Sequence, residues 1–249
     1  MIIPLYKPLG ASTHQLAQKA GQLYQAKATH TGTLDPLAEG VVIVLTGEDR
    51  FQKSTFSEWK KQYHFKIAFG VSTDSHDLLG KITATADTVP PVTELKTQLT
   101  SWLQHHQGTW QQTVPAFSAR RVDGQSSFEL AKQNVDIPTQ AKEVTLFANK
   151  VHNQTALSAP QLSQQAIAAI NTVSGDFRQQ ELLEQWQQFP TQTSITFPEF
   201  SVSVTTSKRL YVRGIVRDIG QNLGVPAVTT TIIRTANGEY SIEDCTCLV

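Results

Sequence analysis

Residues 29–47, "THTGTLDPLAEGVVIVLTG", place one carboxylate, Asp35, in a turn marked by glycine and proline. The short apolar run 41–45 follows, and its β-branched residues predict a buried β-strand. Aspartate is a favoured helix N-cap and proline is favoured at the next position, so one interpretation of Asp35 is a cap. Gly40 and the strand leave room for only about one helical turn. The alternative is that Asp35 serves as a nucleophile or general base.

The composition is that of an ordinary globular protein. Of the 249 residues, 39% are hydrophobic and 17% are charged, which is enough for a core of normal size. The apolar runs are too short to cross a bilayer, and the N-terminus lacks the basic flank and cleavage site of a signal peptide. Cys245 and Cys247 are the only cysteines, and we expect free thiols in a reducing cytoplasm rather than a metal site or a disulfide framework.

The formal net charge is zero, with 21 basic and 21 acidic residues. This balance argues against binding of nucleic acid by bulk charge alone. Residues 207–217, "SKRLYVRGIVR", nevertheless contain four basic residues and no acid. A local basic patch is therefore the expected form of any electrostatic contact.

The predicted secondary structure mixes helices and strands. Strand 63–69 alternates, with Tyr63 on the apolar face. Hydrophobic periodicity and helix-ending residues predict helices at 12–24, capped by Ser12, at 91–104, on both sides of Ser174-Gly175 within 160–189, and at 211–223, ending at Gly224. The same patterns predict strands at 143–149 and 200–205 and a polar turn at 72–80. Residues 227–242 are predicted to form a hairpin turned at Asn237-Gly238. Because strands and helices do not alternate regularly, we expect an α+β fold, not a doubly wound parallel sheet.

The segment "HTGTLDPLAEGVV" at 30–42 resembles the central motif of the TruB family of pseudouridine synthases, which isomerise one uridine in the T-loop of tRNA. Further segments resemble the family in the same order: "YKPLGAS" at 6–12, "KQYHFKIAFGVSTDSHDLLGKI" at 61–82, "VPAFSARRVDGQSSFELAK" at 114–132 and "SKRLYVRGIVRDIGQNLG" at 207–224. The resemblance implies a pseudouridine synthase fold, in which helices pack on a mixed, mainly antiparallel sheet around a central catalytic cleft.

The chain also departs from the family pattern. Arg209-Leu210 stands where the family usually has Gly-Thr, Thr29 where a glycine is common, and Ile232-Ile233-Arg234 where Leu-Arg-Arg is usual. About 40 residues, 155–195, resemble a helical insertion when compared with common loop lengths. We expect a single catalytic domain over 1–249 that contains this insertion and lacks the C-terminal RNA-binding domain of many members.

The resemblance implies that Asp35 is the nucleophile, that Tyr63, Tyr211 and Arg213 complete the catalytic set, and that no cofactor or metal is needed. Arg213 would hold the Asp35 carboxylate bidentately with its planar fork. Tyr63 would lie against the flipped-out uracil and is a candidate for handling a proton; its alternative is a core aromatic residue. Tyr211 and Arg213 share a helix start, where the alternative is a solvated helix end.

The resemblance also implies a set of RNA contacts. His30 would act as a wedge that fills the space left by the base, and its alternative is an exposed turn histidine. The phosphate candidates are Lys7, Arg120, Arg121, Lys208, Arg209 and Arg217. Each has the alternative of an ordinary solvated charge, and Lys7 that of a structural role in the pocket. The expected partner is the T-arm stem-loop of tRNA, bound by a cytoplasmic monomer that does not contact membranes.

Hypotheses from different classes remain. The first is an RNA-modifying isomerase that flips one uridine, expected at position 55 of tRNA, out of the RNA. The second is a catalytically inactive RNA-binding or tRNA-folding protein of the same fold. The complete set of Asp35, Tyr63, Tyr211 and Arg213 favours the enzyme. A hydrolase has little support, since the sequence contains no Gly-x-Ser-x-Gly motif, metal-ligand cluster or phosphate loop.

Overall fold

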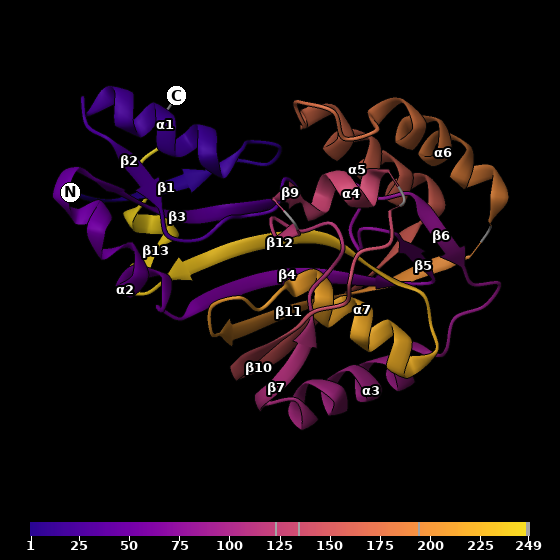
Figure 1. Cartoon of the computed structure of the whole chain (residues 1–249). Coiled ribbons are helices and arrows are strands. Elements are labelled where there is room, and N and C mark those ends of the chain that lie inside the picture. The colour runs from indigo at the N-terminus through magenta and orange to yellow at the C-terminus, as the bar shows by residue number, and fades with distance from the viewer. Residues whose placement is uncertain (123, 134, 194, 248–249) are drawn as a thin grey trace.

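The computed structural model describes residues 1–122, 124–133, 135–193 and 195–247. Within these residues, nine strands form one sheet in the order β1-β3-β12-β4-β11-β10-β7, with β2 added to β3 and β13 to β12 (Figure 1). The strands are β1 Ile2–Lys7, β2 Ala28–His30, β3 Ala38–Thr46, β4 Lys61–Phe69, β7 Gly108–Thr113, β10 Ala141–Ser158, β11 Thr196–Thr206, β12 Ala227–Asn237 and β13 Tyr240–Ser241. Strand β12 is parallel to β3 and antiparallel to β4. The mainly antiparallel α+β fold is confirmed.

Helices cover both faces of this sheet. They are α1 Thr13–Leu23, α2 Lys53–Ser57, α3 Val92–His105, α4 Ser127–Lys132, α5 Ala159–Thr172, α6 Gln179–Gln192 and α7 Val212–Leu223, with short 3₁₀ helices η1 Gly47–Gln52 and η2 Ile242–Asp244. Helices α1, α3 and α7 contribute to the main core, together with Phe65 and Ile67 of β4. Helices α5 and α6 pack with Ala68, which points to the opposite face because side chains alternate along a strand.

Two small two-stranded ribbons lie outside the large sheet. One pairs β5 Val71–Thr73 with β6 Ile82–Thr85, and the other pairs β8 Arg121–Val122 with β9 Gln125–Ser126. No helix in the described ranges is long and apolar enough to cross a membrane.

Strand β3 is buried on both of its faces, which explains its uninterrupted apolar sequence. Val42 and Val44 belong to the main core, whereas Val41, Ile43 and Leu45 pack with other residues, including Phe56, in a separate cluster. The buried strand predicted at 41–45 is confirmed, and the strand extends to both sides of that run. The residues that follow Asp35 in sequence are thus fixed in the interior of the sheet.

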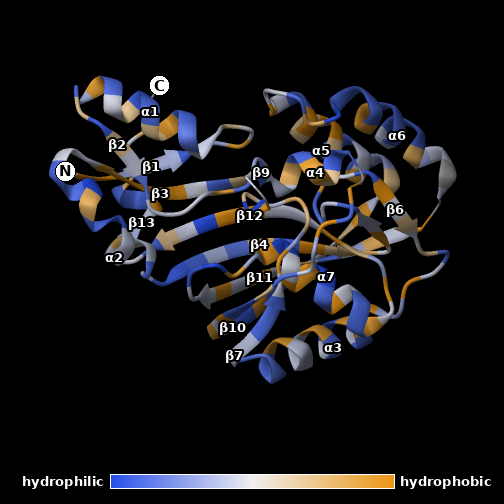
Figure 2. Cartoon of the chain, in the orientation of Figure 1, coloured by the Kyte–Doolittle hydropathy of each residue, from blue (hydrophilic) through white to orange (hydrophobic). Residues whose placement is uncertain are grey.

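The predicted helices are confirmed with small shifts at their ends. Ser12 caps α1 by accepting a hydrogen bond from the Gln15 backbone at 3.4 Å. Helices α5 and α6 flank Ser174-Gly175, and α7 ends at Gly224 with φ of 64°. The amphipathic pattern that predicted α7 is visible in Figure 2, where this helix carries both hydrophobic and hydrophilic residues.

The predicted hairpin needs a correction. Asn237 pairs with Tyr240, so the loop is Gly238-Glu239, one residue later than predicted, and the returning strand β13 has only two residues. Strand β12 instead finds its long partners in β4 and β3. The local sequence encodes the turn, but these partners are distant in sequence and the hairpin pattern does not indicate them.

Candidate active site

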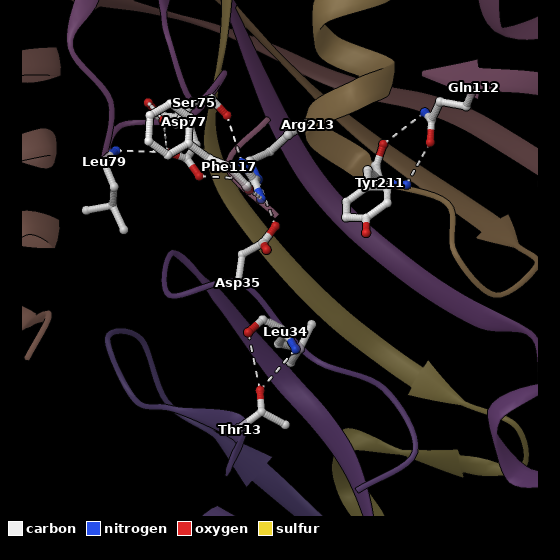
Figure 3. Close-up of polar contacts among 10 residues, drawn as sticks. All are labelled: Thr13, Leu34, Asp35, Ser75, Asp77, Leu79, Gln112, Phe117, Tyr211 and Arg213. Atoms are coloured by element: carbon white, nitrogen blue, oxygen red, sulfur yellow. Dashed lines mark hydrogen bonds and ion pairs between the residues drawn. The ribbon is translucent and has the colours of Figure 1, made fainter. Parts of the chain in front are cut away.

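Asp35 lies in a β-turn between β2 and β3 and not at the start of a helix. Its carbonyl accepts a hydrogen bond from the Ala38 backbone at 3.0 Å, with Pro36 in the second turn position, which proline favours. Its carboxylate Oδ2 accepts a hydrogen bond from Nε of Arg213 at 2.7 Å (Figure 3). The Asp35 side chain is 27% exposed, so it remains accessible. This geometry favours the functional interpretation of Asp35 over the helix cap.

The start of α1 fixes the backbone beside Asp35. The Thr13 hydroxyl accepts a hydrogen bond from the Leu34 backbone nitrogen at 3.0 Å and donates to the Leu34 carbonyl at 3.2 Å (Figure 3). The Gly10 backbone nitrogen donates to the Pro36 carbonyl at 2.9 Å. The loop before α1 and its first residue therefore hold the turn on both sides of the carboxylate.

Two wholly buried cations hold the same turn from within the protein. Lys7 donates from Nζ to the Ala38 carbonyl at 2.5 Å, and burial lowers the pKa of Lys7 to about 8. Arg234 donates from Nε to the Val41 carbonyl at 2.6 Å and from Nη2 to the Gly32 carbonyl at 3.1 Å. The burial of Lys7 favours its structural alternative over a phosphate contact.

Arg213 is 3% exposed and uses all three of its guanidinium nitrogens. Nε binds Asp35, Nη1 donates to the Ser75 carbonyl at 2.9 Å, and Nη2 donates to the Phe117 carbonyl at 2.8 Å (Figure 3). The observed contact with Asp35 is therefore through a single nitrogen and differs from the predicted bidentate one. The reason is that two backbone carbonyls occupy the remaining nitrogens.

Asp77 is a second carboxylate beside Arg213 and was not among the predicted site residues. Its Oδ2 lies 3.4 Å from Nε of Arg213, while its Oδ1 accepts hydrogen bonds from Ser75 Oγ at 2.6 Å and from the Leu79 backbone at 3.0 Å. Burial raises the pKa of Asp77, and the guanidinium opposes this shift. Burial alone would lower the pKa of Arg213, but Asp35 and Asp77 hold it above its ordinary value. Arg213 therefore remains a cation.

Tyr211 is the N-cap residue of α7, and its backbone is fixed by Gln112, another residue without a predicted role. The Tyr211 nitrogen donates to Gln112 Oε1 at 2.9 Å, and its carbonyl accepts from Gln112 Nε2 at 3.1 Å (Figure 3). Burial, followed by the nearby Asp35 carboxylate, raises the pKa of Tyr211, so its phenol stays protonated at neutral pH. A single side chain thus sets the start of the helix that carries Arg213.

Asp35 lines two cavities. The first, of about 550 Å³, also contains Tyr63 and Tyr211 in its wall, so the structure brings these predicted residues together. The second, of about 540 Å³, is lined by Arg213, His30 and an aromatic group formed by Phe117, Phe128 and Phe177. Volumes of this size are typical of sites for small organic groups. The carboxylate is thus accessible from two sides.

The predicted RNA-binding residues lie in several environments. Arg120, Lys208 and Arg209 line the 550 Å³ cavity, where Lys208 is paired with Glu58. Arg217 donates to Asp218 at 2.8 Å and lines a separate cavity of about 410 Å³.

His30 and Arg121 complete the predicted set. His30 lies in the wall of the 540 Å³ cavity, and burial lowers its pKa to about 4, so the ring is neutral at pH 7. Arg121 is exposed and donates to the Gly124 carbonyl at 3.1 Å. Three of the predicted cations therefore share a cavity with Asp35, and Arg121 and Arg217 lie outside its wall.

Arg209 has a left-handed backbone, with φ of 66°. This conformation is disfavoured for residues with a Cβ by roughly 1–2 kcal/mol and is readily adopted by glycine. We expect Arg209→Gly to be more stable than Arg209→Ala by about 1 kcal/mol, because both lose the side chain but only glycine relieves the strain. Denaturant unfolding of the two variants measures this difference. Equal stability would show that the turn is not strained.

Comparison with known proteins identifies the family of the chain. The family model described as "TruB family pseudouridylate synthase (N terminal domain)" matches residues 20–166, more than half of the chain. A protein of Phocaeicola vulgatus named tRNA pseudouridine synthase B is 32% identical over 93% of this chain and 80% of its own length. The protein of the same name from Bacteroides thetaiotaomicron is 30% identical over 96% of this chain and 83% of its own length.

Solved structures show the same fold. The chain is similar to one chain of a crystal structure of a Cbf5-Nop10-Gar1 complex, with a TM-score of 0.60 and 17% identity over 99% of this chain. It spans 52% of the length of that chain, so the likeness concerns the fold alone. The family model and the named relatives show that the chain is a pseudouridine synthase type of isomerase. The sequence matches show that the chain belongs to the TruB family.

Proposed function

We propose that this protein is a tRNA pseudouridine synthase that isomerises a uridine in the T-loop, at position 55, with Asp35 as the nucleophile. The observation that carries this proposal is the Asp35 carboxylate, bound by the buried Arg213 and exposed in a cavity shared with Tyr63 and Tyr211. The proteins from Phocaeicola vulgatus and Bacteroides thetaiotaomicron that carry the name tRNA pseudouridine synthase B support tRNA as the substrate.

The proposed reaction requires a positioned carboxylate and a closed pocket for the uracil. The C1′–N1 bond breaks, the uracil turns, and a C1′–C5 bond forms, while C5 loses a proton and N1 gains one. Arg213 holds the Asp35 carboxylate in one orientation toward the cavity, as a charge-assisted hydrogen bond does. Tyr63, in the wall of the same cavity, would lie against the uracil, and Tyr211 remains a neutral phenol near Asp35. No step in this scheme needs a cofactor.

The target base must leave the RNA stack to reach Asp35, and a loop lowers the free energy needed for this. We assign the 550 Å³ cavity to the flipped uracil, because Tyr63 and Tyr211 both line it. His30, neutral and on the other side of Asp35, is assigned the role of the wedge in the RNA loop. The proposed enzyme acts as a cytoplasmic monomer on the T-arm. Its single domain contains the predicted 155–195 insertion, whose helices are α5 and α6, while residues 155–158 belong to β10.

The direct test is to incubate the protein with unmodified tRNA and to map pseudouridine by chemical labelling. A T-arm stem-loop and a tRNA with cytidine at position 55 are the matched substrates. We expect pseudouridine at position 55 of the tRNA and of the stem-loop, and none in the cytidine-55 tRNA. Modification at another uridine would reject the T-loop assignment, and the absence of any pseudouridine would reject the enzyme.

RNA binding should depend on salt through a local basic patch. We expect replacement of both Lys208 and Arg209 by glutamine to weaken tRNA binding and to reduce the slope of log affinity against log salt by about one to two units. Lys208 is already paired with Glu58, so its charge is partly compensated before RNA arrives. Titrations at several salt concentrations measure the slope. Glu58→Gln is the control. It removes the negative charge that pairs with Lys208, so we expect this variant to bind tRNA more strongly.

A further inference from the structure

Arg178 has an unusual backbone at the edge of the site. It is the N-cap residue of α6, with φ of 60° and ψ of 29°, and its side chain makes no capping hydrogen bond there. A left-handed arginine is disfavoured sterically, and such outliers persist where surrounding contacts enforce them. The contacts of its side chain therefore require an explanation.

The guanidinium of Arg178 connects two segments that are far apart in sequence. Nη1 and Nη2 bind the two carboxylate oxygens of Asp74 at 2.7 and 3.2 Å. The same guanidinium lies over the ring of Phe117, 4.7 Å from its centroid. The Arg178 side chain is only 10% exposed, so solvent screens these interactions weakly. Arg178 thus holds the segment around Phe117 and, at the same time, the turn at 74–80 that follows β5; the turn was predicted at 72–80, but residues 72–73 belong to the strand.

These segments are the ones that supply carbonyl acceptors to Arg213. The Ser75 carbonyl, which accepts from Nη1 of Arg213, belongs to the residue after Asp74. The Phe117 carbonyl, which accepts from Nη2 of Arg213, belongs to the residue whose ring Arg178 covers. One arginine thus contacts Asp35 directly, and the other holds the two segments that orient the first.

We propose that Arg178 is a positioning residue for catalysis, which fixes the Ser75 and Phe117 carbonyls so that Arg213 presents the Asp35 carboxylate in its reactive orientation. This inference rests on the proposed function and adds a residue from the predicted 155–195 insertion to the machinery. Arg178 acts on the reacting atoms only through Asp74 and Phe117. We therefore expect its loss to lower the rate of the chemical step and to leave the affinity for RNA unchanged.

Helix α6 offers a matched control. Glu181 of α6 binds Lys81 at 2.6 Å, so this pair also connects the helix to the residue that follows the 74–80 turn. It makes no contact with the carbonyls that bind Arg213. Loss of the Glu181 pair weakens the attachment of α6 but leaves Asp74 and Phe117 held by Arg178. The Glu181–Lys81 pair is more exposed than the Arg178–Asp74 pair, so Glu181→Gln tests whether a weaker attachment of α6 is by itself enough to slow the reaction.

The test uses the full chain and compares Arg178→Gln, Asp74→Asn, their double variant and Glu181→Gln. We expect Arg178→Gln to lower the single-turnover rate at saturating tRNA by about tenfold to a hundredfold, since small displacements near reacting groups have effects of this size. Asp74→Asn removes the charge of the partner at constant shape and should also lower the rate. The tRNA dissociation constant should be unchanged in both, and Glu181→Gln should keep the wild-type rate.

The double variant provides the sharpest readout. If Arg178 acts through Asp74, the double variant should be no slower than the slower single variant. Multiplicative losses, a wild-type rate in Asp74→Asn, or an equal loss in Glu181→Gln would overturn the proposal. If Arg178→Gln does not fold, the rate of Asp74→Asn decides. Failure of the proposed function is distinguishable, because then the wild-type protein itself would form no pseudouridine.

Discussion

Asp35→Asn should fold normally, bind tRNA at least as tightly as the wild type, and form no detectable pseudouridine. The amide is nearly isosteric and keeps the turn that the Ala38 backbone closes on the Asp35 carbonyl. It is neutral, so it can neither act as a nucleophile nor accept the proton that leaves C5. Binding persists because the lost negative charge repelled RNA phosphates. Pseudouridine mapping, tRNA titration and thermal unfolding on one preparation give the three results.

The exposed Asp87 offers a matched control, since Asp87→Asn removes one negative charge away from the cavities that Asp35 lines. It should leave turnover unchanged. Retained turnover in Asp35→Asn would remove the nucleophile assignment. Loss of folding in that variant would support a structural role, and the RNA-binding alternative would be favoured if the wild type bound tRNA without modifying it.

Arg213→Lys should lower turnover by about tenfold to a thousandfold, although it conserves charge. Lysine has one ammonium in place of three nitrogens, and the observed guanidinium binds Asp35, the Ser75 carbonyl and the Phe117 carbonyl at once. Wherever the ammonium lies, at least one of these three acceptors loses its donor. Leaving a buried acceptor without a hydrogen bond is unfavourable. Single-turnover kinetics at saturating tRNA measure the change.

Arg50→Lys is the corresponding control, because Arg50 lies over the ring of Phe51 in η1 and lines neither cavity beside Asp35 among the described residues. It should behave as the wild type. A near-normal rate for Arg213→Lys would show that charge alone suffices, and the directional hydrogen bonds would then have no catalytic importance.

Local patterns predicted most of the secondary structure. The sequence pattern that predicts an element lies within a few residues for the buried strand 41–45, the helix capped by Ser12 and the helix ending at Gly224. The composition and the mixed order of elements were also enough for the α+β class. The hairpin over 227–242 was misjudged because the long partners of β12 lie near residues 38–40 and 61–69, and no local pattern encodes such pairing.

The candidate site was predictable only in part, for a similar reason. The resemblance to the family implied Asp35, Tyr211 and Arg213, and the structure brings these residues together. The supporting side chains were missed because their partners are backbone atoms from other segments. Gln112 of β7 binds the backbone of Tyr211, and Thr13 of α1 binds the backbone of Leu34. Asp77 had a visible signal, an acid in a glycine-closed turn, but only the fold shows that it faces Arg213.

The parallel pairing of β12 with β3 has a consequence for biosynthesis. Arg234 of β12 holds Gly32 and Val41 on the two sides of the Asp35 turn, and Arg213 also comes from late in the chain. A ribosome-bound nascent chain that has emerged only as far as β11 contains Asp35 but neither Arg213, which binds its carboxylate, nor Arg234. Contacts between such distant residues also form slowly. We therefore expect the turn around Asp35 to reach its final geometry only after residues 196–237 have emerged from the ribosome.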